Sequence, residues 1–168
     1  MSIFGLSYCF KQVTLNNGIK ITLKIIDTGG QEKYRSLSKS YYKCDAALFV
    51  FPLNNLESFE NIREWIKLFE ENSKAVKFLV GNNNSLERIV DDDLIKNFVK
   101  ETNLKYKSVD ARVNDGIVDL FQDVAESIFE NYINTLDKEE KFKLLRKFRS
   151  KYLMDVKIPN IYLKFINY

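Results

Sequence analysis

Two apolar runs near the start of the chain flank a turn sequence. They lie at about Tyr8–Leu15 and Ile19–Ile26, and Asn16-Asn17-Gly18 stands between them. Asn and Gly are the residues that most readily take the positive φ angles of a tight hairpin turn. We therefore predict two strands that pair antiparallel.

Three further apolar runs predict additional strands. The runs at 46–51 and 76–80 are short and almost continuous, which suits strands that are buried on both faces of a sheet. A weaker strand is expected at about 104–109. Between the runs, apolar side chains recur at three- and four-residue spacing, which is typical of amphipathic helices.

The first of these helices is expected at 57–72, after Asn54-Asn55, which can supply its N-cap. A second follows Asp91-Asp92-Asp93, because negative charge favours a helix N-terminus. A third carries the apolar side chains between Ile117 and Ile128 on one face. Strands that alternate with helices of this length predict βαβ units, and hence an α/β fold with a mainly parallel sheet and one antiparallel edge.

The character of the chain changes from about Asp137. Residues 138–151 contain seven Lys or Arg, with Glu139 and Glu140 as the acidic residues, and a helix there would carry an apolar stripe. We expect an appended basic helix. Two interpretations stay open, namely a peripheral membrane contact through this helix and a solvated helix or tail without such a role.

Composition narrows the functional classes. The 168 residues carry 26 Lys and Arg against 23 Asp and Glu, and a net charge of +3 gives no reason to expect nucleic-acid binding. The chain has no His, which excludes histidine-based acid–base, triad and metal chemistry. We interpret Cys9 and Cys44 as reduced cysteines of a cytoplasmic protein. No run approaches the ~18 apolar residues that span a bilayer.

One motif identifies a family. Residues 27–35, D-T-G-G-Q-E-K-Y-R, follow a predicted strand and resemble the D-T-A-G-Q-E-x-Y/F-R switch motif of Rab proteins, a branch of the Ras-like small GTPases. Residues 40–43, S-Y-Y-K, are similar to the S-Y-Y-R segment that ends the family's second helix. Residues 56–65 are similar to its E-S-F-x-N-V/I-x-x-W signature. The order and spacing of the blocks also match, over roughly residues 5–133.

The resemblance implies a fold and a domain organisation. The fold is a three-layer P-loop NTPase sheet with helices on both faces, here without its N-terminal part. A Rab-like domain is expected at 1–135. The C-terminal extension at 136–168 would hold the basic helix.

The resemblance also assigns roles to individual residues. Asp27 would hold Mg²⁺ through water, Gly30 would offer its backbone N–H to the γ-phosphate of GTP, and the catalytic residue Gln31 would orient the attacking water. Asn82 and Ala111 would contact the base. The implied cofactors are GTP or GDP with Mg²⁺.

Several family features are absent or changed. The sequence has no G-x-x-x-x-G-K-S/T phosphate loop, which the family places before the segment present here. Residues 81–85, G-N-N-N-S, replace the family's G-N-K-x-D, and residues 109–112, V-D-A-R, replace T-S-A-K. The hydroxyl of Ser85 cannot replace a two-point carboxylate acceptor, so we expect weak guanine discrimination. A chain that binds no nucleotide at all is the alternative.

The family's first strand lies in the centre of its sheet, between the strands expected here at 20–26 and 46–51. An empty slot would leave buried backbone groups unpaired at ~1–3 kcal/mol each, against a net stability of ~5–15 kcal/mol. Three solutions are open: the sequence is a fragment, the flanking strands pair directly, or another segment fills the slot. Residues 157–168 are too apolar for a solvated tail, and their β-rich run 161–166 is a candidate for the slot. A helix docked on the sheet is the alternative.

Two functional classes follow. The first is a Rab-like GTP-binding switch in vesicle traffic, which binds effector or regulator proteins through the switch region Gln31–Tyr42 and the adjoining strands. The second is a pseudo-GTPase that binds partners without nucleotide. Asn83, Ser85 and Ile3, which stands where the family has a Mg²⁺-binding Thr, favour the second. Asp27, Gly30 and Gln31 favour the first. The sequence ends without the prenylated cysteines of the family, so we expect a cytoplasmic protein with at most peripheral contact with endomembranes.

We predict that the 168-residue chain does not bind GTP tightly, because it contains no phosphate loop. Titration of the purified chain with a fluorescent GTP analogue and Mg²⁺ should show no saturable binding at low micromolar concentrations. A submicromolar dissociation constant would contradict this prediction.

Overall fold

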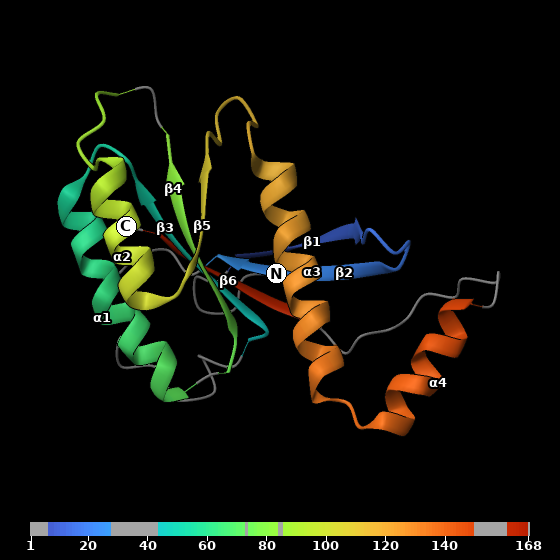
Figure 1. Cartoon of the computed structure of the whole chain (residues 1–168). Coiled ribbons are helices and arrows are strands. Elements are labelled where there is room, and N and C mark those ends of the chain that lie inside the picture. The colour runs from blue at the N-terminus through green and yellow to red at the C-terminus, as the bar shows by residue number, and fades with distance from the viewer. Residues whose placement is uncertain (1–6, 28–43, 73, 84–85, 150–160, 168) are drawn as a thin grey trace.

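The computed structural model describes residues 7–27, 44–72, 74–83, 86–149 and 161–167. Six strands form one sheet in the spatial order β1-β2-β6-β3-β4-β5. They are β1 (Ser7–Thr14), β2 (Lys20–Asp27), β3 (Ala46–Pro52), β4 (Val76–Asn82), β5 (Lys105–Val109) and β6 (Ile161–Asn167). β1 pairs antiparallel with β2, and the other described pairs of strands are parallel. The predicted α/β fold with one antiparallel edge is confirmed (Figure 1).

The hairpin of β1 and β2 forms as predicted. Gly18 has a backbone φ of +85°, which residues other than glycine rarely adopt. Its N–H donates to the carbonyl of Leu15 at 2.8 Å. The side chain of Asn17 accepts a hydrogen bond from the backbone N–H of Ile19 at 3.1 Å. The turn therefore uses Gly18 for its backbone conformation and Asn17 as a side-chain acceptor.

Helices cover both faces of the sheet (Figure 1). α1 (Leu56–Asn72) and α2 (Asp92–Thr102) lie on one face, and α3 (Ile117–Thr135) lies on the other. The N-cap of α1 is one of the two residues predicted for it, and α2 starts in the acidic run predicted for its N-terminus, where Asp91 is in addition the N-cap. The side chain of Asn55 accepts from the N–H of Ser58 at 2.9 Å, and that of Asp91 accepts from the N–H of Leu94 at 2.8 Å.

The protein has a hydrophobic core on each face of the sheet, and alternate side chains of β3 point into one core or the other. Phe49 and its neighbours two residues away pack under α1 and α2, whereas Leu48 packs under α3. Trp65 of α1 is buried in the core under α1 and α2, where it serves packing. Cys9 is exposed and Cys44 is partly buried, and neither forms a disulfide within the part of the chain that the structure describes. Among the described residues, no helix is both long and apolar enough to cross a bilayer.

β6 occupies the centre of the sheet. It pairs in parallel with Leu23–Asp27 of β2 through Ile161–Phe165, and with Ala46–Val50 of β3 through Leu163–Asn167. β2 and β3 do not pair with each other in this order. The prediction that residues 161–166 fill the slot is therefore confirmed, and direct pairing of the flanking strands is not what the chain adopts.

The basic helix is also present, as α4 (Lys138–Arg149). It begins with a reciprocal cap, because the side chain of Asp137 accepts from the N–H of Glu140 at 2.8 Å while that of Glu140 accepts from the N–H of Asp137 at 3.1 Å. Figure 1 shows α4 standing away from the sheet. The extension thus contributes both a projecting helix and a central strand.

We predict that the amides of residues 161–166 exchange with solvent as slowly as those of residues 46–51, because both segments lie inside the same hydrogen-bonded sheet. Hydrogen exchange followed by mass spectrometry or NMR measures this. Complete exchange of residues 161–166 within seconds would contradict the central position of β6.

Candidate nucleotide edge of the sheet

Three of the five sequence-predicted site residues lie at the carboxyl edge of the parallel strands. Asp27 ends β2, Asn82 ends β4, and Ala111 follows shortly after the end of β5. The carboxyl ends of parallel strands share one edge of a sheet, and α/β proteins bind ligands outside that edge. The topology therefore places the three residues along one side of the molecule.

The strand registers give the spacing along this edge. Asp27 is level with Leu48, because both pair with Phe165, whereas Asn82 is level with Pro52. Four residues along the strands and three strand spacings across them separate Asp27 from Asn82, which amounts to a distance on the order of 20 Å. Such a separation suits the two ends of an extended ligand and is too long for one small ion to bridge.

Asn82 and Ala111 are brought together directly. The side-chain oxygen of Asn82 accepts a hydrogen bond from the backbone N–H of Ala111 at 3.1 Å. The backbone N–H of the next residue, Asn83, donates to the carbonyl of Val109 at 2.7 Å. These two bonds tie the loop after β4 to the loop after β5, so the two predicted base-contacting residues form one unit.

Close packing behind Asn82 fixes the end of β4. Gly81 has no room for a side chain, since an added Cβ would lie 2.7 Å from the hydroxyl oxygen of Tyr106 and 2.8 Å from a methyl group of Leu53. Burial raises the pKa of the Tyr106 hydroxyl, with a smaller opposing effect of its hydrogen bond to Ser108. The carbonyl of Asn82 also accepts from the N–H of Leu53 at 3.0 Å. Sequence reasoning did not find Tyr106, because its contact with Gly81 depends on the pairing of β4 with β5.

The loop after β5 is held by an ion pair. Arg112 donates to the two carboxylate oxygens of Asp110, from its Nη2 to Oδ2 at 2.8 Å and from its Nε to Oδ1 at 3.3 Å. Asp110 and Asp115 also exchange two backbone hydrogen bonds of 3.0 Å. The side-chain hydrogen bonds from Arg112 lower the pKa of the Asp110 carboxyl, and backbone bonds act in the same direction. The ion pair closes the loop that presents Ala111.

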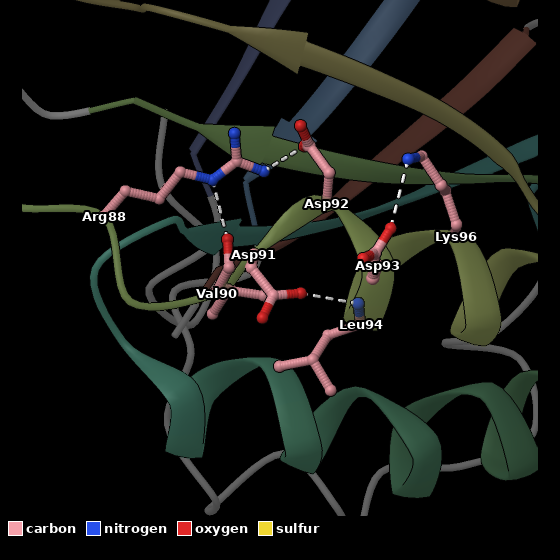
Figure 2. A network of polar contacts seen from close by, with 7 residues as sticks. All are labelled: Arg88, Val90, Asp91, Asp92, Asp93, Leu94 and Lys96. Carbon is pink, nitrogen blue, oxygen red and sulfur yellow. Dashed lines mark hydrogen bonds and ion pairs between the residues drawn. The ribbon is translucent and has the colours of Figure 1, made fainter.

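A second polar network anchors the chain between this edge and α2 (Figure 2). Arg88 donates from Nε to the carbonyl of Val90 at 2.7 Å and pairs with Asp92 in the first turn of α2. Val90 is fully buried, and its N–H donates to the carbonyl of Leu53 at 2.9 Å. The network fixes the N-terminus of α2 close to the end of β3.

Of the predicted phosphate and Mg²⁺ residues, the structure describes Asp27 alone. Asp27 is solvent-exposed at the end of β2. Gly30 and Gln31 lie outside the described residues, as does Ser85. Among the residues that the structure describes, no group of three His, Cys, Asp or Glu side chains could hold a metal ion. The roles of Asp27, Gly30 and Gln31 therefore stay predictions.

Comparison with known proteins places the chain. A family model described as the Ras family matches residues 2–130. Ras-related protein Rab-5B of Plasmodium falciparum is 29% identical over 136 residues, which cover 79% of this chain and 65% of that protein. Human Ras-related protein Rab-30 is 33% identical over 138 residues, which cover 79% of this chain and 68% of that protein. Ras-related protein Rab-10 of Caenorhabditis elegans is 27% identical over 146 residues, which cover 84% of this chain and 72% of that protein. The chain thus spans about two thirds of the length of these relatives.

We predict that Arg112→Ala lowers the free energy of unfolding at neutral pH, and that this loss disappears in acid. The pKa of Asp110 is lower in the folded state than its ordinary value of 3.8. The ion pair therefore stabilises the fold at pH values above 3.8, and this stabilisation is lost as the pH falls through the pKa of Asp110 in the folded protein. Urea denaturation of both proteins across this range measures the difference.

The control is Asp110→Asn, in which Arg112→Ala should have an effect that does not vary with pH over the same range. An equal effect of Arg112→Ala at neutral and acidic pH in the otherwise unchanged chain would contradict the assignment.

Proposed function

The chain belongs to the Ras family and is a Rab-type small GTPase of the Ras superfamily, and on this basis we propose that it acts in vesicle traffic by binding effector or regulator proteins. The partners engage the exposed face of β1 and β2 together with the adjoining switch region Gln31–Tyr42. Ras-family membership implies GTP or GDP and Mg²⁺ as ligands. In this chain we propose that nucleotide binding is impaired.

The observation that carries the proposal is an exposed aromatic face on the hairpin. Tyr8 is 48% exposed and Phe10 is 64% exposed, and their rings meet edge to face with centroids 5.8 Å apart. The ammonium of Lys24 on β2 lies 4.7 Å from the centroid of the Tyr8 ring. Aromatic side chains are enriched in protein–protein interfaces, and two of them stand side by side here, whereas single exposed apolar side chains need no explanation.

The direction of this face follows from strand alternation. Lys11 lies 5.2 Å from the ring centroid of Phe121 on α3, and Val13 is buried in the core beneath α3. Tyr8 and Phe10 alternate with these residues, so they point to the opposite face of the sheet. On β2 the same face carries Lys24 and Ile26, the register partners of Phe10 and Tyr8. β2 ends at Asp27, and the switch region follows it along the chain. The described part of the proposed surface is therefore this face of the hairpin.

The residues at the sheet edge fit a nucleotide in part. The bond between Asn82 and Ala111 supports a base-binding role for this pair, with Asp27 as the proposed Mg²⁺ residue, Gly30 as a phosphate donor and Gln31 as the residue that orients water. Asn83 and Ser85 do not supply the Lys and the Asp that read guanine in the family. We therefore propose weak discrimination between guanine and other bases, since a lost charged hydrogen-bond partner costs ~1.5–3 kcal/mol.

A pseudo-GTPase that binds partners without nucleotide is the second candidate. The pairing of β6 with β2 and β3 favours it, because the sheet is completed by the chain's own backbone and the aromatic face of the hairpin is attached to the domain without a ligand. The two candidates share the same binding surface. They differ in whether nucleotide changes the affinity for partners.

We also propose a cytoplasmic location with peripheral contact on endomembranes. α4 is the element that supports this proposal, because its segment 138–151 is strongly basic and Phe142 on it is 63% exposed. Basic amphipathic helices of this kind bind anionic lipid surfaces.

We predict that Phe10→Ala weakens partner binding by about tenfold or more, which is the effect of removing an interface anchor worth ~1.4 kcal/mol or more. The immobilised chain would be incubated with cell extract, and the retained proteins of the membrane-traffic machinery would be quantified by mass spectrometry. Val118→Ala is the matched control, because Val118 has an exposure similar to that of Phe10 but lies on α3, which covers the opposite face of the sheet.

Equal retention by the unchanged chain and Phe10→Ala would contradict the proposed surface. Repeating the assay with GTP, with GDP and without nucleotide separates the two candidates. A nucleotide-dependent difference supports the switch, and identical retention in all three conditions supports the pseudo-GTPase.

A further inference from the structure

The slot between β2 and β3, which β6 fills in this structure and which is called the groove below, is a binding site for one extended strand. Both of its walls are apolar and buried, since Leu23, Ala46 and Leu48 have no exposed surface. Each wall offers its backbone groups in a parallel ladder, to Ile161–Phe165 on the β2 side and to Leu163–Asn167 on the β3 side. Neither wall has a protective bulge or proline within the paired residues, so an open groove would accept any matching strand.

The strand that fills the groove is joined to the domain by a long connection. α3 is the last helix that packs on the sheet, and α4 and residues 150–160 separate it from β6. In the part of α4 that the structure describes, the ion pair joins Lys143 to Glu139 of the same helix. The capping bonds likewise stay within this segment, between Asp137 and Glu140. Figure 1 shows that α4 projects from the body of the domain.

This connection is long enough to reach a neighbouring molecule. A helix of 12 residues spans about 18 Å, and the residues between α4 and β6 can add at most about 35–40 Å when extended. A domain of this size has a radius of gyration of about 15 Å. The groove of a molecule in contact with this one is therefore within reach of β6.

The order of folding favours exchange. Leu23 and its partner Ile161 are far apart in sequence, as are Ala46 and Leu163, whereas β1 with β2 and β3 with β4 are close neighbours along the chain. Pairings between distant segments pay the larger loop-closure entropy and form late. The groove thus stays open longest while the chain folds, and at high concentration the β6 of another copy competes for it.

We propose that this chain forms a dimer by reciprocal exchange of β6, in which the groove of each copy is filled by residues 161–167 of the other. The contacts of the strand are the same in the monomer and in the dimer, which is why exchange of an identical element is a low-cost route to association. Because the exchanged strand is central, its return requires the sheet to open. The dimer formed during folding therefore persists after dilution.

Two single-cysteine chains test the exchange. Lys24 and Tyr162 are register partners in adjacent strands, so cysteines at both positions meet at a distance that allows a disulfide. In a background of Cys9→Ser and Cys44→Ser, one full-length chain carries Lys24→Cys and the other carries Tyr162→Cys. The two are unfolded together, refolded at low and at high concentration, oxidised, and resolved on a non-reducing gel.

We expect a disulfide-linked heterodimer after joint refolding, with a ratio of dimer to monomer that rises about tenfold for a tenfold higher concentration while the dimer is the minor species. Chains refolded separately and then mixed should give none. The matched control uses Gln12→Cys in one chain and Thr22→Cys in the other, which are register partners within the hairpin and should not link two chains above the level of random collision.

Two results would overturn the proposal. One is a yield of linked Lys24→Cys and Tyr162→Cys chains no higher than the yield of the hairpin control at every concentration. The other is a chain carrying both Lys24→Cys and Tyr162→Cys that forms only the intramolecular disulfide at high concentration, as shown by a monomer band that shifts on reduction.

Discussion

The backbone hydrogen bonds of β6 hold the two parts of the sheet together. In the described structure, β2 has β1 on one side and β6 on the other, so the hairpin joins the rest of the sheet through β6. The aromatic face of the hairpin and Asp27 are thereby fixed relative to Asn82 and Ala111 on the far side of the groove. A strand that follows the basic helix in sequence thus sets the geometry of both proposed surfaces.

The fold was predictable where the signals are local. The cap Asn55 and the acidic start of α2 follow from residue type and position, and Gly18 marks a turn that needs a positive φ. The position of β6 followed from an energetic argument, because an empty central slot costs more than the fold can spare. The ion pair of Asp110 with Arg112 and the contact of Gly81 with Tyr106 were not predicted. They arise from the conformation of one loop and from the register of β4 with β5, which no spacing in the sequence reveals.

The chain belongs to a GTPase family but lacks residues with which that family reads guanine. The chain is a Rab-type small GTPase, and a hydrogen bond links Asn82 and Ala111 at the edge of its sheet. Around that link, Asn83 and Ser85 lack the chemistry that reads guanine. The hairpin, by contrast, presents Tyr8 and Phe10 to solvent on a sheet that the chain completes by itself. Partner binding through this face is therefore the activity that we propose.

The contribution of β6 can be measured by removing it and adding it back. A chain shortened to residues 1–160 should lose cooperative urea unfolding and the chemical-shift dispersion of a folded sheet, since the central ladders are gone. Addition of excess peptide with the sequence of residues 160–168 should restore both. A shortened chain that unfolds cooperatively, with the same midpoint and free energy as the 168-residue chain, would contradict the account.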